Sequence, residues 1–505
     1  MVAGTVVFGA FMAVMDMSVV NVALPHMMGS FGQDQSSITW VATAYSIAEI
    51  VMVTMAGWWS TLIGRKRLYL ASFAVFTGGS MLCGTAHTFG AMLTFRIIQG
   101  LGGGSLIPLS QAILRETFPH EEQGMAMAVY SMGVVLAPAI GPIVGGWLTD
   151  SYGWPWIFYI NVPVCIVGML LVGAYVHDPP YLRRGIRKVD WVGIGLLAVT
   201  LTTLQVVLER GQEDNWFDSR LILGMTALCV LAGLGLIAWE LVVEEPVVNL
   251  RLLKDRSLTV GSAMALVFGV ALAGSGFVLP QFTQNLLGFP ALQAGLVLAP
   301  RALTLLMVMP LVGWLYRRWD SRVLVAVGTA LILWSYYLLA RLALGAGFAQ
   351  LVPALLIMGA GMPFMFVTLS TVALSTMPRA DMTEASSVYN LLRRVGSNIG
   401  YAVVATLVAR GMQEHRVDMV GHISNFGTRY AAFAGRSQQL LVQAGVPGPL
   451  RPQMVLALAN RLLNRQAAMH AYNDVSRALG LLSLLVLPLV LLLPGRRKLP
   501  GVGTR

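Results

Sequence analysis

Charged residues are scarce in this chain of 505 amino acids. Asp, Glu, Lys and Arg together make up 11% of it, whereas soluble domains contain about 25%. Hydrophobic residues make up 56%, and the mean hydropathy is +0.71. Apolar runs of about 20 residues, long enough to cross the hydrocarbon layer of a bilayer as a helix, recur along the chain. The composition therefore excludes an ordinary soluble domain and indicates an integral membrane protein.

Several other sequence features are missing, and each absence excludes a fold, a kind of site or an activity. The apolar runs do not alternate with polar residues, so a β-barrel is excluded and the fold is all-α. Cys83, Cys165 and Cys229 fall in apolar runs without paired spacing, which predicts neither disulfides nor a metal site. No Gly-Lys dipeptide is present, so a phosphate-binding loop for ATP is excluded. With no enzyme signature and no cofactor motif, we predict that the protein is not an enzyme.

The basic residues do not indicate nucleic acid binding. The formal net charge is +11, but these residues are scattered among short loops without an accompanying aromatic stripe. They fit the positive-inside rule for a chain with both termini in the cytoplasm. The basic segments 64–67, 181–188, 316–322 and 495–498 then lie inside, and the acidic segment 209–219 lies outside.

The apolar runs predict fourteen transmembrane helices. Their ranges are 3–23, 39–58, 68–88, 90–113, 125–148, 156–176, 190–208, 222–242, 258–280, 293–315, 322–342, 349–373, 386–409 and 478–494. Residues 410–477 form a long outside connection between the last two. Within it, apolar residues at helical spacing predict an amphipathic helix at 454–472. Two interpretations of this helix are a helix resting on the outer face of the protein and a docking surface for another protein.

The chain also repeats itself. The segment GWWSTLIGRKR at 57–67 corresponds to GWLYRRWDSR at 313–322, and Leu24-Pro25 corresponds to Leu279-Pro280 at nearly the same spacing. Internal repeats of this kind are typical of secondary transporters, which bind substrate between the two repeats. We therefore predict three parts, which are an N-terminal six-helix bundle at 1–189, a two-helix insertion at 190–257 and a C-terminal six-helix bundle at 258–505.

Ionisable side chains inside the predicted spans are functional candidates, since a charge within the bilayer is unfavourable. Asp16 and Arg96 lie about 10 Å and about 9 Å from the outer ends of their helices, so they can pair. Such a pair can load and release a proton, or it can form a permanent structural bridge. Glu49 lies about 15 Å deep, near the midplane, with no arginine within one turn in sequence. We expect it to bind a proton or another cation.

One predicted span is rich in small residues and proline. Residues 137–148 contain Pro138, Gly141, Pro142, Gly145 and Gly146. Small residues allow close contact between helices, and prolines bend the helix axis. The span therefore serves either as a hinge or seal between the halves, or simply as a tightly packed helix.

Four motifs carry a resemblance to a known family. They are Asp16, Asn21, Ala23, Leu24 and Pro25 in the first helix, RIIQGLGGG at 96–104, GPIVGG at 141–146 and WPWIFYINVP at 154–163. In these motifs the chain resembles the major facilitator superfamily, and within it the fourteen-helix drug:proton antiporters of the EmrB/QacA type. The resemblance covers essentially the whole chain.

The resemblance implies two six-helix bundles with two additional central helices. It also implies that Asp16 takes part in proton coupling and that Arg96 takes part in proton transfer. The long outer loop at 410–477 resembles that of Gram-negative members, which work with a periplasmic adaptor and an outer-membrane channel. In the loop after the second helix, Gly57, Gly64, Arg65 and Lys66 match the family pattern, but Thr61 replaces its usual acid.

The sequence thus predicts a proton-driven exporter of hydrophobic or amphipathic compounds in the bacterial inner membrane, with both termini cytoplasmic and the proton gradient as its energy source. Proton coupling is assigned to Asp16, Glu49 and Arg96. Polar groups predicted to face the substrate cavity are Asn21, Tyr45, Gln99, Tyr389, Asn390 and Arg393. The alternatives are an exporter of an endogenous lipid or fatty acid without obligatory proton coupling, an uptake symporter, and a membrane-embedded lipid-modifying enzyme.

Overall fold

The computed structural model describes residues 2–119, 122–177, 189–289, 291–421 and 428–493. Within these ranges the regular elements are helices, and no strand occurs. The all-α prediction is therefore confirmed for the described part of the chain. The predicted cytoplasmic segments 181–188 and 495–498 lie outside it.

The helices before residue 190 form what we call the N-terminal half. They are α1 (Val2–Phe31), α2 (Gln35–Ile38), α3 (Trp40–Ile63), α4 (Arg65–Gly84), α5 (Phe89–Gly104), α6 (Leu106–Thr117), α7 (Gln123–Tyr152), α8 (Trp156–Tyr159) and α9 (Asn161–Tyr175). The chief contacts inside this half join α1 to α7, and α5 to both α3 and α4.

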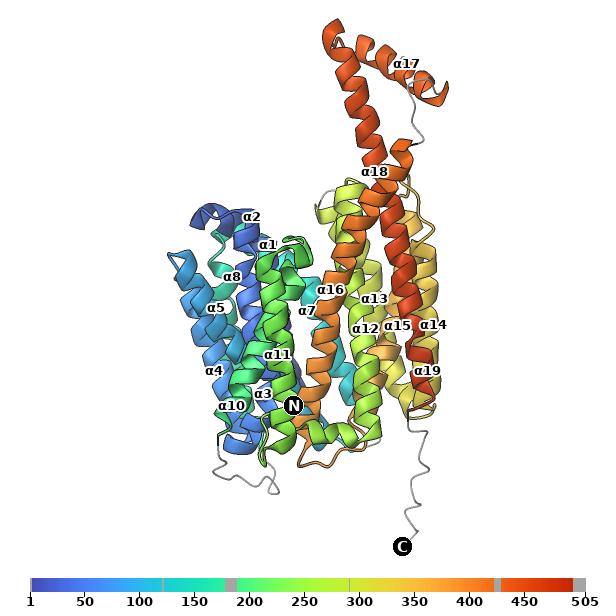
Figure 1. Cartoon of the computed structure of the whole chain (residues 1–505). Coiled ribbons are helices and arrows are strands. Elements are labelled where there is room, and N and C mark those ends of the chain that lie inside the picture. The colour runs from blue at the N-terminus through green and yellow to red at the C-terminus, as the bar shows by residue number, and fades with distance from the viewer. Residues whose placement is uncertain (1, 120–121, 178–188, 290, 422–427, 494–505) are drawn as a thin grey trace.

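Two long helices follow, α10 (Trp191–Arg210) and α11 (Arg220–Val242), with the short helix η1 (Trp216–Asp218) between them. They pack on one another, and α10 also contacts α3 and α16. Figure 1 shows α11 between the blue and the yellow-to-red helices.

The helices after residue 249 form what we call the C-terminal half. They are η2 (Leu250–Lys254), α12 (Arg256–Gln281), η3 (Phe282–Leu286), α13 (Ala291–Tyr316), α14 (Ser321–Leu339), α15 (Phe348–Ala373), α16 (Met382–Gly421), α17 (Thr428–Gln443), η4 (Gly448–Leu450), α18 (Arg451–Leu484) and α19 (Val486–Val490). Extensive contacts join α12 to α16, and α15 to both α13 and α14.

Each predicted span coincides with a helix or a pair of consecutive helices. In the described residues, twelve helical stretches are long and apolar enough to cross a membrane. The more polar helices α4 and α16 are not among them. The count of fourteen spans therefore stays a prediction, although a helix is present at every range that it requires.

The bundle has two distinct ends, which we name by what lies there. At the terminal end, α1 begins and α19 finishes, and at the hairpin end helical segments project beyond the bundle (Figure 1). The projecting part is formed by the end of α16, by α17 and by the start of α18. We call it the projecting hairpin.

The projecting hairpin does not fit the first of the two interpretations of residues 454–472, a helix resting on the outer face of the protein. The predicted segment 454–472 is helical, but it belongs to α18, which continues without a break for 34 residues toward the terminal end. Helix α16 is likewise continuous for 40 residues. Because these two long helices pack on one another, they stand upright instead of lying flat.

Candidate functional site

Asp16 is the centre of a group of buried polar side chains that we call the N-terminal polar cluster. Its members are Asp16, Ser80, Arg96, Gln99 and Asn161. Asp16 Oδ2 accepts a hydrogen bond from Arg96 Nη1 at 2.7 Å. Asp16 Oδ1 accepts from Gln99 Nε2 at 2.8 Å and from Asn161 Nδ2 at 2.7 Å. The pairing of Asp16 with Arg96 that equal depth predicted is confirmed.

Arg96 is enclosed by this cluster and by aromatic rings. Its Nε donates to the carbonyl of Val41 at 3.0 Å, and its Nη1 also donates to Gln99 Oε1 at 2.7 Å. The guanidinium carbon lies 4.3 Å from the centre of the Tyr45 ring, a cation–π contact. Arg96 and Asp16 are 0% and 1% exposed. A proton bound by Asp16 would therefore leave the charge of Arg96 without a counter-ion.

Glycines in the motif at 96–104 make this cluster possible. A Cβ on Gly100 would lie 2.5 Å from the carbonyl oxygen of Tyr45, and one on Gly102 would lie 2.3 Å from the backbone nitrogen of Phe76. Helix α5 can thus approach both α3 and α4 only because these positions have no side chain. The close approach places Gln99 on α5 within hydrogen-bonding distance of both Asp16 on α1 and Ser80 on α4.

Glu49 pairs with an arginine from the other half. Glu49 Oε2 on α3 accepts a hydrogen bond from Arg394 Nη2 on α16, and we call this contact the inter-half ion pair. The same nitrogen of Arg394 lies 3.1 Å from the sulfur of Met17, the neighbour of Asp16. The side chain of Glu49 is 2% exposed and that of Arg394 is 27% exposed. The pair therefore connects the two halves next to the N-terminal polar cluster.

A second set of polar contacts joins the halves between the inter-half ion pair and the terminal end. Gln111 Oε1 on α6 accepts hydrogen bonds from Ser386 Oγ at 2.8 Å and from Asn390 Nδ2 at 2.7 Å, both on α16. All three residues are buried. A single glutamine thus binds two consecutive turns of the opposing helix.

Nearer the terminal end the backbones themselves meet. The amide of Gly57 donates to Ser387 Oγ at 3.2 Å, and a Cβ on Gly57 would lie 2.5 Å from the Cα of Glu384. Arg115 donates to the carbonyl of Thr371. A Cβ on Gly124 would lie 3.1 Å from the carbonyl oxygen of Gly313. The halves are closely joined at this end.

The motif residues after the second helix also lie at the terminal end. Gly64 has a φ of +91°, which favours glycine at the turn from α3 to α4. Lys66 Nζ donates to the carbonyl of Gly173 at 2.6 Å. Thr61 donates its hydroxyl to the carbonyl of Trp58 at 2.7 Å. Without an acid at position 61, Arg65 forms its ion pair with Glu116 on α6.

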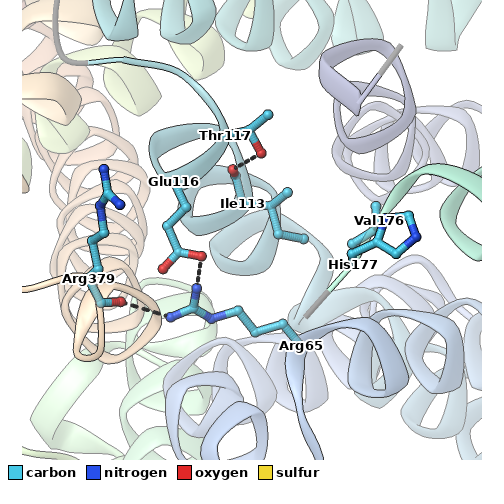
Figure 2. Close-up of a pocket in the computed structure, with 7 residues that line it drawn as sticks. All are labelled: Arg65, Ile113, Glu116, Thr117, Val176, His177 and Arg379. Carbon is cyan, nitrogen blue, oxygen red and sulfur yellow. Dashed lines mark hydrogen bonds and ion pairs between the residues drawn. The ribbon is translucent and has the colours of Figure 1, made fainter. Parts of the chain in front are cut away.

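Figure 2 shows the pocket that surrounds Arg65, with Glu116 on one side of it and Arg379 beside them. Its volume is about 280 Å³. Arg65 Nη2 donates to the carbonyl of Arg379 at 3.1 Å, so the ion pair also connects to the other half. The lining residues are Arg65, Ile113, Glu116, Thr117, Val176, His177 and Arg379. Since the pocket lies at the terminal end, it is not the predicted cavity at mid-depth.

Helix α10 connects the halves nearer the hairpin end. Glu209 accepts hydrogen bonds from Thr43 on α3 and from Gln205 on α10, and Gln205 accepts one from Asn398 on α16. Helix α10 therefore contacts both halves through polar side chains.

The small residues of the fifth predicted span face α1 within the N-terminal half. A Cβ on Gly141 would lie 2.6 Å from the side chain of Ser18, and one on Gly145 would lie 3.0 Å from the carbonyl oxygen of Val19. Ser18 Oγ donates to the carbonyl of Pro138 at 3.3 Å. In this conformation the contacts fit tight packing, while Pro142 is exposed and Gly146 is only partly buried.

The residues predicted to face the substrate cavity do not form one group. Tyr45 and Gln99 belong to the buried surroundings of Arg96. Tyr389 and Asn390 are each 2% exposed, on the face of α16 that meets the N-terminal half. These four side chains therefore do not line an open cavity in this conformation.

Asn21 and Arg393 are the remaining two. Asn21 is exposed on α1. Arg393 is partly exposed, lies over the ring of Phe366 at 5.5 Å, and donates to Asn390 Oδ1 at 3.3 Å. They remain predicted substrate contacts.

Sequence reasoning missed several polar residues that the structure brings into these contacts. Asn161 and Ser80 complete the N-terminal polar cluster, and Gln111 forms the contact with Ser386 and Asn390. Arg301, in the middle of α13, was also overlooked. The available signal was a polar side chain inside an apolar run, the same signal that identified Asp16 and Glu49.

Many apolar helices that pack as two halves, with charges paired at mid-depth, are typical of secondary transporters. A family model described as Major Facilitator Superfamily matches residues 6–401. The multidrug export protein EmrB of Escherichia coli (strain K12) is 32% identical over 431 residues, 85% of this chain and 84% of that protein. The fatty acid resistance protein FarB of Neisseria gonorrhoeae is 33% identical over 483 residues, 95% of this chain and 93% of that one.

Solved structures agree in fold. The human organic anion transporter MFSD10 (TETRAN) has a TM-score of 0.62 at 14% identity, with 95% of this chain and 98% of that chain covered. The proton:xylose symporter XylE has a TM-score of 0.61 at 13% identity, with 98% and 96% covered. The protein is thus a multi-pass membrane transporter. It belongs to the major facilitator superfamily and, within that superfamily, to the EmrB-type family.

Proposed function

We propose that this protein exports hydrophobic or amphipathic compounds across the bacterial inner membrane in exchange for protons, by alternating access. The observation that carries the proposal is the inter-half ion pair of Glu49 and Arg394. A proton on Glu49 removes the charge that attracts Arg394, so proton binding weakens a contact between the halves. Loss of the proton restores it. The protonation state of one buried carboxyl group thereby favours one arrangement of the halves over another.

Asp16 is the second proposed coupling group, and Arg96 is its partner. Because these two residues are enclosed within one half, a proton there would act through the packing of α1, α5 and α9. The contacts at the terminal end close the side that the basic loops assign to the cytoplasm. In this arrangement release of the substrate takes place at the hairpin end, on the periplasmic side.

The test is transport in proteoliposomes under an imposed pH gradient, with a hydrophobic dye and a fatty acid as substrates. We expect the wild type to respond to the gradient, and Glu49→Gln to lose that response while still binding substrate. Asp16→Asn shows whether the second carboxylate is coupled as well. Arg477→Gln, which changes a side chain that is 65% exposed on α18, is the matched control. Transport that ignores the gradient in the wild type would overturn the proposal.

A second candidate is export of an endogenous lipid or fatty acid without obligatory proton coupling. The relative FarB, named for fatty acid resistance, favours it. In the same assay this candidate predicts fatty acid transport that is unaffected by the gradient or by Glu49→Gln.

The proposal also includes a periplasmic adaptor and an outer-membrane channel. The projecting hairpin supports it, since Val417, Leu440 and Leu456 on its three helices are 71%, 65% and 62% exposed. The double variant Val417→Asp, Leu456→Asp places charges on this apolar surface. It is expected to abolish the drug resistance of cells, while transport in proteoliposomes continues. Equal loss in both assays would place the defect in the transporter itself.

A further inference from the structure

In the C-terminal half, the charged residues in the central turns of helices α12 to α16 are all basic. Between Arg256 and Gln413 the sequence contains three acidic residues, Asp320, Asp381 and Glu384. All three lie at the terminal end, where α14 and α16 begin. The central turns of α12 to α16 therefore contain arginine but no carboxylate of their own.

Three arginines lie in those central turns. Arg394 is neutralised from the other half by Glu49. Arg393 donates to Asn390, and its Nε is buried without a hydrogen-bond partner. Arg301 lies about 15 Å along α13 from the hairpin end of that helix. Among the described residues no carboxylate pairs with Arg393 or with Arg301.

The surroundings of Arg301 are polar without being anionic. Its Nη1 donates to Ser275 Oγ on α12 at 3.5 Å, at the limit of a hydrogen bond. The hydroxyls of Tyr336 on α14 and Tyr401 on α16 also interact electrostatically with the guanidinium. The backbone of α13 at this residue touches α15, since a Cβ on Gly359 would lie 2.4 Å from the carbonyl oxygen of Arg301. Arg301 thus lies where α13 meets α12, α14, α15 and α16.

This place is open on one side. Arg301 is only partly buried, Gly276 on α12 is exposed, and Tyr401 is 47% exposed. The hydroxyl of Tyr401 lies 3.7 Å from where a Cβ of Gly276 would be, so the two border the same space beside Ser275. A charge at this depth is unfavourable without a counter-ion, and none of the residues that the structure describes supplies one. A ligand can therefore supply it.

We infer that Arg301 binds the anionic head of an amphipathic substrate, a single-chain carboxylate, while the apolar tail remains in the hydrocarbon layer. An anion reaches mid-depth of a bilayer only when an apolar tail carries it there, so a small hydrophilic anion does not fit the site. The inference rests on the proposed function and deepens it by naming the residue that selects an anionic head over a cationic one. It also assigns a different role to each half. The N-terminal half contains the proton-binding carboxylates of Asp16 and Glu49, and the C-terminal half contains the substrate-binding guanidinium of Arg301.

The experiment measures equilibrium binding to the purified protein in nanodiscs of phosphatidylcholine. The probes are radiolabelled dodecanoate and dodecyltrimethylammonium, which have alkyl tails of nearly equal length and opposite charge. For Arg301→Gln we expect dodecanoate binding to weaken about ten-fold or more, while binding of the cation stays within two-fold of the wild type. Arg301→Lys is expected to retain most of the affinity for dodecanoate, because it keeps the positive charge.

A matched control removes another arginine from the same half. Arg341 is exposed beyond the end of α14, where it lies 4.4 Å from the ring of Tyr337, and Arg341→Gln is expected to leave both probes unaffected. Equal weakening of both probes by Arg301→Gln, or no weakening, would overturn the inference. A further outcome concerns anionic lipid added to the nanodiscs. If phosphatidylglycerol displaces dodecanoate and free dodecanoate does not displace phosphatidylglycerol, the site binds a lipid, and the inference of a substrate site is overturned.

The outcome is separable from that of the proposed function. Binding is measured without a pH gradient, so it can fail while proton-driven export of a dye continues. Conversely, an uncoupled transporter would still show the charge preference at Arg301.

Discussion

At the scale of single residues, Asp16 and Arg96 neutralise one another inside the N-terminal half. Asp16 accepts three hydrogen bonds there, and the cation faces the Tyr45 ring. A change in one partner therefore leaves the other as a buried charge without a counter-ion, which is more destabilising than loss of both.

Arg96→Leu is expected to lower the free energy of unfolding by about 3–5 kcal/mol, because Asp16 then has no counter-ion. The double variant that combines it with Asp16→Asn is expected to recover part of this loss, since the asparagine is neutral. Thermal unfolding of the purified protein in detergent measures both. A double variant that loses the sum of the two single effects would show that the two residues do not interact.

The depth of a charged residue along its helix can be predicted from the sequence. Its ion-pair partner can be predicted only when both residues lie in the same half. Asp16 and Arg96 were paired correctly because their helices begin at recognisable apolar boundaries, and each residue advances a helix by a fixed rise. The partner of Glu49 was missed, since Arg394 lies 345 positions away and the rotation of α16 about its axis depends on how the halves meet. Tyr45 and Gln99 were assigned to a cavity for the same reason.

At the scale of helices, absent side chains decide which pairs approach closely. Gly100 and Gly102 bring α5 against α3 and α4, and Gly359 brings α15 against α13. The sequence predicted where the helices lie, because long apolar runs determine that. It could not predict which face of a glycine-rich helix meets which neighbour.

Gly100→Ala is expected to lower stability by about 1–3 kcal/mol, because the new methyl group would meet the backbone oxygen of Tyr45. Gly78→Ala in α4 is the matched control, since nothing lies within 4 Å of its added Cβ. Alanine favours a helix over glycine by about 1 kcal/mol, so the control is expected to be neutral or stabilising. Unfolding midpoints compare the two. A destabilised Gly78→Ala would attribute the effect to lost flexibility instead of contact.

The pair α10 and α11 contains two carboxyl groups that face one another. Asp190 Oδ2 and Glu240 Oε1 are buried without hydrogen-bond partners, and both lie within 3.0 Å of the point where a Cβ on Gly193 would be. Two such groups repel one another when both are charged.

Glu240→Gln is therefore expected to stabilise the protein by about 1 kcal/mol, because an amide can donate a hydrogen bond to Asp190. The exposed Glu244 provides the control variant Glu244→Gln, which is expected to change nothing. Unfolding midpoints at neutral pH test the difference. A destabilised Glu240→Gln would show that both carboxylates are needed.

At the scale of the whole molecule, contacts near the terminal end hold the halves together. Gln111 binds Ser386 and Asn390, and the backbone of Gly57 meets α16. Alternating access requires these contacts to break in every cycle.

In the double variant Gln111→Cys, Ser386→Cys, a reducible cross-linker between the two thiols is expected to stop transport. Reduction of the cross-linker is expected to restore transport. The background variant replaces Cys83, Cys165 and Cys229 with alanine, so that only the introduced thiols react. Transport by each single-cysteine variant after the same treatment is the control. Continued transport by the cross-linked protein would show that the halves need not separate here.

The length of α16 has a mechanical consequence. The helix is continuous for 40 residues, about 60 Å, and it carries Arg394 within the bundle and the projecting hairpin at its far end. A stiff rod of this length acts as a lever. A small change of tilt at the inter-half ion pair becomes a much larger displacement at the tip. A protein bound to the end of the projecting hairpin would therefore be displaced in every transport cycle, at a distance from the transport pathway.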